Sequence, residues 1–241
     1  MAIEQNGGHK FKKTIKNFFT FAPDLEEIKA VIIMKIVFAT GNSGKLREAS
    51  EILGGGFELV TPVQMGITDD VPETGLTLKA NSIIKAEHIW KSCGCSCFAD
   101  DTGLEVSALG GAPGVHTARY AGEGKDFGKN IDKLISELDL LRAECSMAEE
   151  LGVKMNRYSR RARFRSVITL ILDGEKYFFE GTLEGSIAYY RSGEGGFGYD
   201  PVFMPDEFPG RTLADITEEE KNAISHRGKA LRAMAAFLNS R

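Results

Sequence analysis

Long hydrophobic runs are missing from this sequence of 241 residues, and their absence excludes a helical membrane protein of the usual kind. No apolar stretch approaches the roughly 18 residues that a helix needs to cross a bilayer. The short run from Phe18 to Ala22 comes after four lysines and ends at Pro23, so it is too short for the apolar segment of a signal peptide. We therefore expect no membrane partner.

An excess of positive charge is also missing. With 30 Lys and Arg against 34 Asp and Glu, the formal net charge is −4, whereas a general nucleic-acid binder usually carries a basic excess. We expect no nucleic-acid partner, and a polyanionic ligand must be met by a local basic site. Hydrophobic content of 42% and charged content of 27% are ordinary for a globular protein, which predicts a real core.

Cysteine is scarce, with four residues in the chain, of which Cys93, Cys95 and Cys97 are clustered and Cys145 stands alone. Zinc sites typically use two-residue gaps and a second pair of ligands, so this alternate spacing disfavours zinc. Free thiols in a reducing compartment are the expected state, and we predict a cytoplasmic location.

The first 33 residues differ in pattern from the rest of the chain. Residues 1–33 mix Gly, Lys and Phe without a clear period, whereas Met34 leads at once into the buried-strand pattern of residues 35–39. We predict that residues 1–33 are an extension outside the domain and that residues 34–241 form the domain. The alternative for the extension is an arm that binds a membrane surface or a partner.

Two adjacent acids interrupt the apolar stretch Cys97–Val106. Neighbouring strand residues point to opposite faces, so Asp100 and Asp101 can converge only if the strand kinks, and Gly103 would supply the freedom to kink. Converged carboxylates repel unless a cation relieves them, and oxygen ligands of this kind suit Mg²⁺. The alternative is an ordinary Asx-type turn between two strands.

A loop of small residues, Thr40-Gly41-Asn42-Ser43-Gly44-Lys45, joins the first strand to a helix that ends at three glycines, residues 54–56. The N-terminus of a helix favours an anion, so this loop is a candidate phosphate site. It is not a Walker A loop, because only two residues separate Gly41 from Gly44-Lys45 and Leu46 comes next. The alternative is that the glycines serve only the turn.

The other elements can be predicted from periodicity. Apolar spacing and turn signals indicate strands over 57–61, 162–172, 176–181, 186–190 and 202–204, and helices over about 77–91, from 126 past 141, and from 217 to the end. For residues 145–161 we predict a further helix and then a basic linker, 157–163. The order of elements indicates an α/β fold with a mixed twisted sheet.

Three more features are polar and have both a functional and an ordinary interpretation. Thr77, Asn81 and Lys85 share a helix face behind Glu73, which is either a solvated stripe or part of a phosphate site. The glycine-rich stretch 193–201 carries Phe197 and Tyr199 and allows a flat ring to approach the backbone. The third feature, the pair His226-Arg227, lies where the C-terminal helix is interrupted and offers donors, or is simply on the surface.

Taken in order, these stretches resemble the Ham1-like inosine triphosphate pyrophosphatases, a family of non-canonical purine (XTP/dITP) nucleoside triphosphate pyrophosphatases. The likeness runs from Met34 to the C-terminus and rests on the blocks ATGNSGK, ETGLT, ADDTGLEV, GGAPGV, ARY, GGFGYDP and EEKNAISHRGKA. It implies an elongated two-lobed α/β fold with a mixed twisted sheet, a central substrate cleft and a homodimer. It also implies Mg²⁺-dependent hydrolysis of ITP, dITP and XTP to the monophosphate and pyrophosphate.

The resemblance also implies roles for individual residues. Asp101 would be the general base that activates water, and Glu73, Asp100 and Asp101 would hold the metal. Substrate contacts would come from Thr40, Gly41, Asn42, Ser43, Gly44, Lys45, Lys85, Thr102, Phe197, Gly198, Tyr199, Asp200, Lys221, His226 and Arg227. Among these, Lys85 and Lys221 would face phosphate, Phe197 would stack on the base, and His226 and Arg227 would donate to the purine 6-oxygen.

The sequence departs from the pattern at Thr102, where many relatives have Ser, although the hydroxyl is retained. Two other functions stay open at this point. One is a Maf-type pyrophosphatase that acts on pyrimidine triphosphates, and the other is a nucleotide-binding module without catalytic activity.

Overall fold

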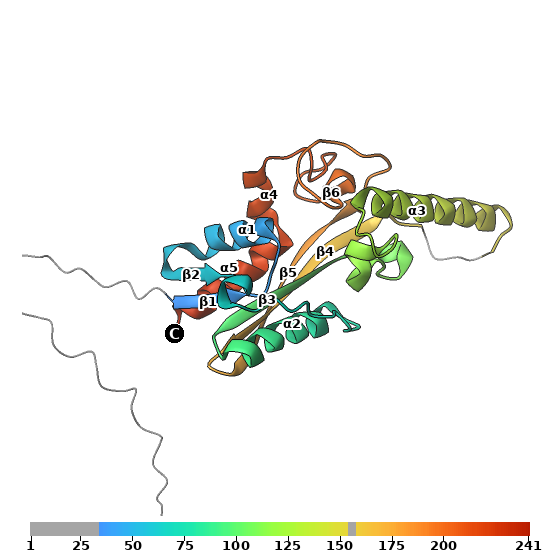
Figure 1. The fold of residues 1–241 in the computed structure, drawn as a ribbon. Helices are drawn as coiled ribbons and strands as arrows, with labels where there is room; N and C mark the ends of the chain where they lie inside the picture. The colour runs from blue at the N-terminus through green and yellow to red at the C-terminus, as the bar shows by residue number, and fades with distance from the viewer. Residues whose placement is uncertain (1–33, 154–157) are drawn as a thin grey trace, which may run out of the picture. The chain divides into compact units, whose positions relative to one another are not determined.

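A mixed sheet of six strands runs through the centre of the protein, in the order β2-β1-β3-β4-β5-β6 (Figure 1). The computed structural model describes residues 34–153 and 158–241, all of which belong to one compact unit, Ile33–Arg241. The strands are β1 (Met34–Phe38), β2 (Phe57–Val60), β3 (Cys97–Val106), β4 (Arg161–Leu172), β5 (Glu175–Ile187) and β6 (Phe203–Pro205). The predicted extension, residues 1–33, lies outside the described residues.

Strand direction changes at β3. On one side β1 runs parallel to both β2 and β3, as expected for strands joined by helical crossovers. On the other side β3, β4, β5 and β6 are antiparallel to their neighbours. The predicted hairpin between β4 and β5 is confirmed, since Asp173 and Gly174 both adopt positive φ, at 52° and 87°, which two-residue hairpin turns require.

The helices are α1 (Ser43–Leu53), α2 (Leu78–Cys93), α3 (Phe127–Glu150), α4 (Glu218–Ile224) and α5 (His226–Asn239). One core cluster joins α1 and α5 to one face of the sheet, for example through Leu53 and Leu231 packed with Phe98. Another joins α2 to the opposite face through Ile89. The α/β class and the mixed sheet are thereby confirmed, with helices on both faces (Figure 1).

Strand β3 is regular, and the predicted kink is wrong. Every residue from Cys97 to Val106 pairs with a residue of β4 without a bulge. Asp100 and Asp101 therefore point to opposite faces of the sheet. Gly103 has a different purpose from the one predicted, because a Cβ there would lie 2.6 Å from the carbonyl oxygen of Gly114. Glycine at this position lets another segment approach β3 closely.

Several boundaries differ from the prediction. Helix α3 continues to Glu150, so Cys145 belongs to it and not to a further helix, and β4 already begins at Arg161 within the predicted basic linker. Residues 186–190 form no strand of their own, because Ser186 and Ile187 continue β5. Of the stretch 145–161, residues 154–157 lie outside the described residues.

Candidate active site

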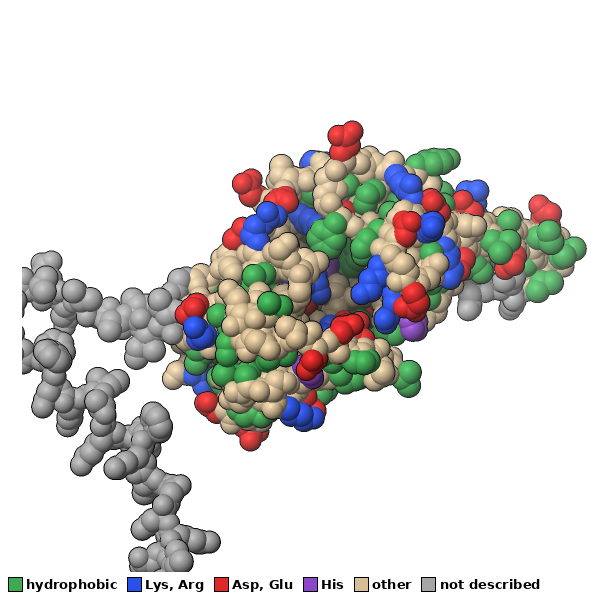
Figure 2. Space-filling view, viewed as in Figure 1, with side chains coloured by type: hydrophobic (Ala, Val, Ile, Leu, Met, Phe, Trp, Pro, Cys, Tyr) green, Lys and Arg blue, Asp and Glu red, His purple; other side chains and the backbone are tan. Residues whose placement is uncertain are grey.

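A cavity of about 960 Å³ opens at the middle of the sheet. Figure 2 shows its mouth as a hollow in the surface, with basic and acidic side chains around it. Its wall takes residues from the start of α1, from α2 and β3, from the loop before β6, and from α4 and α5. The predicted site residues all line it with one exception, Ser43, which belongs to α1 but does not reach the cavity.

The loop between β1 and α1 is held by its own side chains. Asn42 caps the helix, since its Oδ1 accepts hydrogen bonds from the amides of Gly44 at 2.9 Å and Lys45 at 3.2 Å. The Asn42 amide in turn donates to Thr40 Oγ1 at 3.1 Å. The predicted helix N-terminus therefore exists, but the Gly44 and Lys45 amides are already engaged by Asn42, which leaves the Lys45 side chain as the loop's main positive charge.

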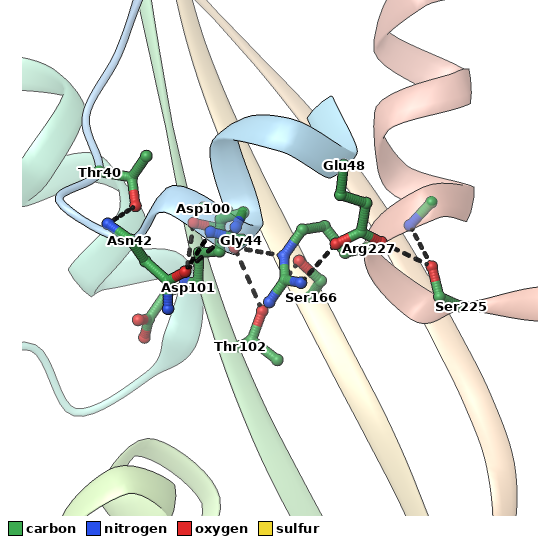
Figure 3. A network of polar contacts seen from close by, with 12 residues as sticks. Thr40, Asn42, Gly44, Glu48, Asp100, Asp101, Thr102, Ser166, Ser225 and Arg227 are labelled. Carbon is green, nitrogen blue, oxygen red and sulfur yellow. Dashed lines mark hydrogen bonds and ion pairs between the residues drawn. The ribbon is translucent and has the colours of Figure 1, made fainter. Parts of the chain in front are cut away.

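Asp100 lies on the α1 and α5 side of β3, where two cations hold it. Figure 3 shows one of them, Arg227. Lys45 Nζ donates to Asp100 Oδ1 at 2.9 Å and Arg227 Nε donates to Asp100 Oδ2 at 3.0 Å. Burial acts to raise the pKa of Asp100, but the charges of Lys45 and Arg227 outweigh burial and hold the pKa below its ordinary value. Asp100 is therefore a buried carboxylate that stays ionised.

Arg227 extends this network to α1. Its Nη1 donates to Glu48 Oε2 at 2.7 Å, while Ser225 Oγ donates to Glu48 Oε1 at 3.0 Å (Figure 3). Arg227 is 6% exposed, and its Nη2 makes no hydrogen bond with the described residues. Because Nε and Nη1 are engaged by Asp100 and Glu48, Nη2 is the nitrogen of this guanidinium that is left to contact a substrate.

Asp101 lies on the opposite face of β3, where two side chains of α2 hold it. Its Oδ1 accepts from Lys85 Nζ at 2.9 Å and its Oδ2 from Asn81 Nδ2 at 3.3 Å. The same Lys85 Nζ donates to Glu73 Oε1 at 2.8 Å. Burial raises the pKa of Asp101 above its ordinary value, although Lys85 opposes the shift. The helix face predicted from Asn81 and Lys85 thus serves the cavity, whereas Thr77 caps α2.

The metal ligands that we predicted do not form one cluster. Among residues 34–153 and 158–241, no three His, Cys, Asp or Glu side chains lie together as a group that would hold a metal ion. The reason is the regular strand, which turns Asp100 away from Asp101 and towards two cations. Glu73 and Asp101 do lie together, because both contact Lys85.

The glycine-rich loop forms the other end of the cavity. Phe197 is 56% exposed and presents its ring to the cavity. Asp200 Oδ2 accepts from the Phe197 amide at 2.7 Å and from Lys221 Nζ at 2.5 Å, and that Nζ lies 4.6 Å from the Phe197 ring centroid. Within the described residues, Lys221 therefore lies beside the aromatic ring and pairs with Asp200, and not with Glu73, Asp100 or Asp101. Tyr199 is 1% exposed and is mainly a core residue.

His226 is a buried histidine without polar partners. Its ring stacks on Phe164 with centroids 4.9 Å apart, and neither ring nitrogen has a hydrogen-bond partner among the described residues. Burial, together with the charges of Arg227 and Lys221, lowers the pKa of His226 well below its ordinary value. The imidazole is therefore neutral, and both of its nitrogens are buried with their hydrogen-bonding capacity unused among the described residues.

Comparison with known proteins identifies the family of this chain. A model of the Ham1 family matches residues 36–237. The chain belongs to the Ham1 family. A dITP/XTP pyrophosphatase of Porphyromonas gingivalis is 47% identical over 206 residues, which cover 85% of this chain and 97% of that protein. One of Bacillus subtilis is 40% identical over 212 residues, which cover 87% of this chain and all of that protein.

Solved Ham1 structures share the fold. The Staphylococcus aureus Ham1 protein is 37% identical with a TM-score of 0.73, covering 86% of this chain and 98% of that one. A HAM1 protein from Coxiella burnetii is 36% identical with a TM-score of 0.75, covering 87% and 100%. The resemblance inferred from the sequence blocks is thereby confirmed.

In this Ham1 chain, Thr102 keeps a polar role. Its Oγ1 donates to Ser166 Oγ at 3.2 Å and lies 3.4 Å from Asp100 Oδ2.

Glu48 is a site residue that the sequence reasoning missed, although its place one turn after Lys45 on the same helix was a usable signal. In the described part of the chain, no helix combines the length and apolar character that a membrane span requires.

Proposed function

We propose that this Ham1-family protein hydrolyses non-canonical purine nucleoside triphosphates, such as ITP, dITP and XTP, to the monophosphate and pyrophosphate. The observation that carries the proposal is the cavity itself. It has lysines and carboxylates at one end, with Asp101 among them, and an exposed Phe197 with an unpartnered His226 at the other. The charged end suits a triphosphate, and the aromatic end suits a purine base. The relatives are named dITP/XTP pyrophosphatases, which agrees with such a substrate.

Asp101 is the proposed general base. It takes a proton from water, which attacks the α-phosphorus in line while pyrophosphate leaves. Asn81 and Lys85 hold the two carboxylate oxygens of Asp101 from α2, so the base has a fixed orientation. Lys45 and Lys85 provide positive charge for the phosphate groups.

Glu73 and Asp101 are the residues that we propose to hold Mg²⁺. They fit this ion because Mg²⁺ is usually bound by one or two carboxylates, with water and substrate phosphates completing its shell. Asp100 is left out, since Lys45 and Arg227 already neutralise it. Bound Mg²⁺ would neutralise charge on the phosphate oxygens.

We propose that His226 recognises the 6-position of the purine base, and that Phe197 stacks on the same base. A neutral imidazole has one N–H donor, which would bond to the 6-oxygen of hypoxanthine or xanthine. Adenine has an amino donor there, and a buried donor facing a donor costs on the order of 1–3 kcal/mol, or roughly 10- to 100-fold in discrimination. The free Nη2 of Arg227 would add to this preference.

A panel of nucleoside triphosphates, assayed for pyrophosphate with Mg²⁺ and with a chelator in its place, tests the proposed function. We expect release from ITP, dITP and XTP with Mg²⁺, and at least about 10-fold less from ATP. Preferred release from dTTP or UTP would support the Maf-type alternative. ITP binding without release from any nucleotide would support the non-catalytic module. A homodimer and a cytoplasmic location stay predictions.

The pH dependence of hydrolysis tests the pairing of Asp101 with Lys85. Since the base acts when deprotonated, kcat/KM should fall as pH falls through a pKa above the ordinary Asp value of about 4. Lys85 lowers the pKa of Asp101, so Lys85→Met should move this acid limb to higher pH. Lys79→Met, on α2 but outside the cavity lining, is the control and should leave the limb in place. An unmoved limb in Lys85→Met would contradict the pairing.

A further inference from the structure

Positive charge in the cavity is in short supply. Nine Asp and Glu residues line the cavity, against seven Lys and Arg. Most of these cations already have a carboxylate partner: Lys45, Arg47, Lys85, Lys221 and Arg227 all form ion pairs with acids that also line the cavity. A triphosphate adds several negative charges, so cations without a partner matter most for binding it.

Arg119 is such a cation. It lines the cavity and is partly buried, yet its guanidinium makes no hydrogen bond or ion pair with the described residues. Lys125 also makes none within the described part of the chain, but it is exposed. Arg119 is therefore the unpaired cation that is best placed to meet a ligand inside the cavity.

The backbone beside Arg119 is fixed, in contrast to its side chain. Asn130, which is fully buried, accepts a hydrogen bond from the Ala121 amide at 2.6 Å and donates one to the Ala118 carbonyl at 3.0 Å. This single amide group therefore holds the chain on both sides of Arg119. Lys133 adds a third contact, to the carbonyl of Tyr120 at 2.8 Å.

The segment is also fixed against β3. Arg119 ends the 3₁₀ helix η4 (Gly114–Arg119), in which Thr117 Oγ1 accepts from the Leu104 amide at 2.8 Å. The Thr117 carbonyl accepts from the Tyr199 hydroxyl at 3.0 Å. Close contact between Gly114 and Gly103 seats η4 on the strand that carries Asp101. A rigid backbone that holds an unpaired guanidinium reduces the entropy lost on binding.

The charge of Arg119 acts on the acidic end of the cavity. Burial works to raise the pKa of Glu73, but the charges of Lys85, Lys45 and Arg119 lower it overall. Glu73 contacts Lys85, which contacts Asp101. Arg119 lines the same cavity as Glu73 and Asp101, and the contact of Gly114 with Gly103, two residues after Asp101, places the start of its 3₁₀ helix at the acid-bearing part of β3. We therefore group Arg119 with the residues around the reacting phosphates.

We propose that Arg119 binds the β- and γ-phosphates of the triphosphate, which leave together as pyrophosphate. The inference rests on the proposed function and adds a residue to it. A guanidinium binds two phosphate oxygens at once through its planar fork. Because Arg119 has no carboxylate partner to give up, this contact costs no existing ion pair.

The test compares Arg119→Ala and Arg119→Lys with the wild type in Mg²⁺ buffer, using ITP as substrate and inorganic pyrophosphate and IMP as competing inhibitors. Arg119→Ala should lower kcat/KM for ITP by about 10- to 100-fold and weaken pyrophosphate inhibition to a similar extent. IMP inhibition should not change, because IMP lacks the two outer phosphates. Arg119→Lys should recover part of the loss. Lys129→Ala, which removes a nearby charge outside the cavity lining, should behave as wild type.

Two results would overturn the inference: unchanged ITP turnover and pyrophosphate inhibition in Arg119→Ala, or an equal loss for IMP and pyrophosphate. Since the Arg119 side chain bonds to nothing in the described fold, both variants should melt as the wild type does, and a lower melting temperature in both would also count against it. A wild type that hydrolyses no purine triphosphate would instead refute the proposed function. Pyrophosphate inhibition or binding would still report on Arg119 separately.

Discussion

Asp101→Asn is expected to lower kcat for ITP hydrolysis by about 10²- to 10⁴-fold, the usual contribution of a general base. The amide has the shape of the carboxylate but does not accept a proton from water. Lys85 keeps Glu73 as its partner, so the ion-pair network on α2 survives. Since burial makes the charged form of Asp101 unfavourable, neutral Asn should not lower the melting temperature. Pre-steady-state and steady-state release of pyrophosphate measure the effect.

Asp173→Asn is a matched control for this variant. It makes the same chemical change in the β4–β5 turn, where φ is 52°, a backbone conformation that Asn tolerates well. We expect wild-type turnover from the control. If Asp101→Asn kept kcat within about 10-fold of wild type, Asp101 would not be the base.

Arg227→Met is expected to lower the free energy of unfolding by about 3–5 kcal/mol, because removing one partner of a buried ion pair leaves the other charge uncompensated. Arg227 is paired with both Asp100 and Glu48, and all three side chains are largely buried. For a chain of this size the loss corresponds to a fall in melting temperature of roughly 10 °C. Urea unfolding at neutral pH measures it.

Arg161→Met provides the contrast, since Arg161 pairs with Asp206 through two bonds but both side chains are half exposed. An exposed pair is worth about 0–1 kcal/mol. Adding Glu48→Gln to Arg227→Met should restore part of the lost stability by removing one of the stranded charges. Equal losses in Arg161→Met and Arg227→Met would show that burial of the network does not matter.

The stability of Arg227→Met should also depend on pH in a defined direction. The folded-state pKa of Asp100 is lowered, so this group stabilises the fold above its unfolded pKa of about 4, and the contribution disappears as pH falls through the folded value. Arg227 supplies part of that shift. The difference in stability between wild type and variant should therefore narrow as pH falls below about 4.

Much of the fold could be predicted because its signals are local. The change from apolar runs to helical spacing marks β1 and α1, and Asp173-Gly174 marks the β4–β5 turn. The cap of α4 is equally visible, since Thr217 and Glu220 form the predicted capping box. These signals depend on residues within a few positions of one another, so tertiary packing had little opportunity to override them.

The predictions that failed depended on contacts between distant residues. The predicted kink in β3 rests on the cost of two adjacent acids, but cations of α1 and α5 neutralise Asp100 and a cation of α2 neutralises Asp101. Arg227 lies 127 positions from Asp100 in the sequence, and no local sequence pattern indicates that these two residues form an ion pair. Gly103 was misinterpreted for the same reason, since the Gly114 carbonyl that requires it comes from another segment.

The regular strand β3 has a consequence for how this protein can change over evolutionary time. Because Asp100 is bonded by residues of α1 and α5 while Asp101 is bonded by residues of α2, a mutation in one helical layer removes hydrogen bonds of one acid and leaves those of the other in place. Catalytic activity, which depends on Asp101, and stability, which depends on Asp100, can then change independently. Substitutions in α2 could change catalysis while the ion pairs of Asp100 with Lys45 and Arg227 stay intact.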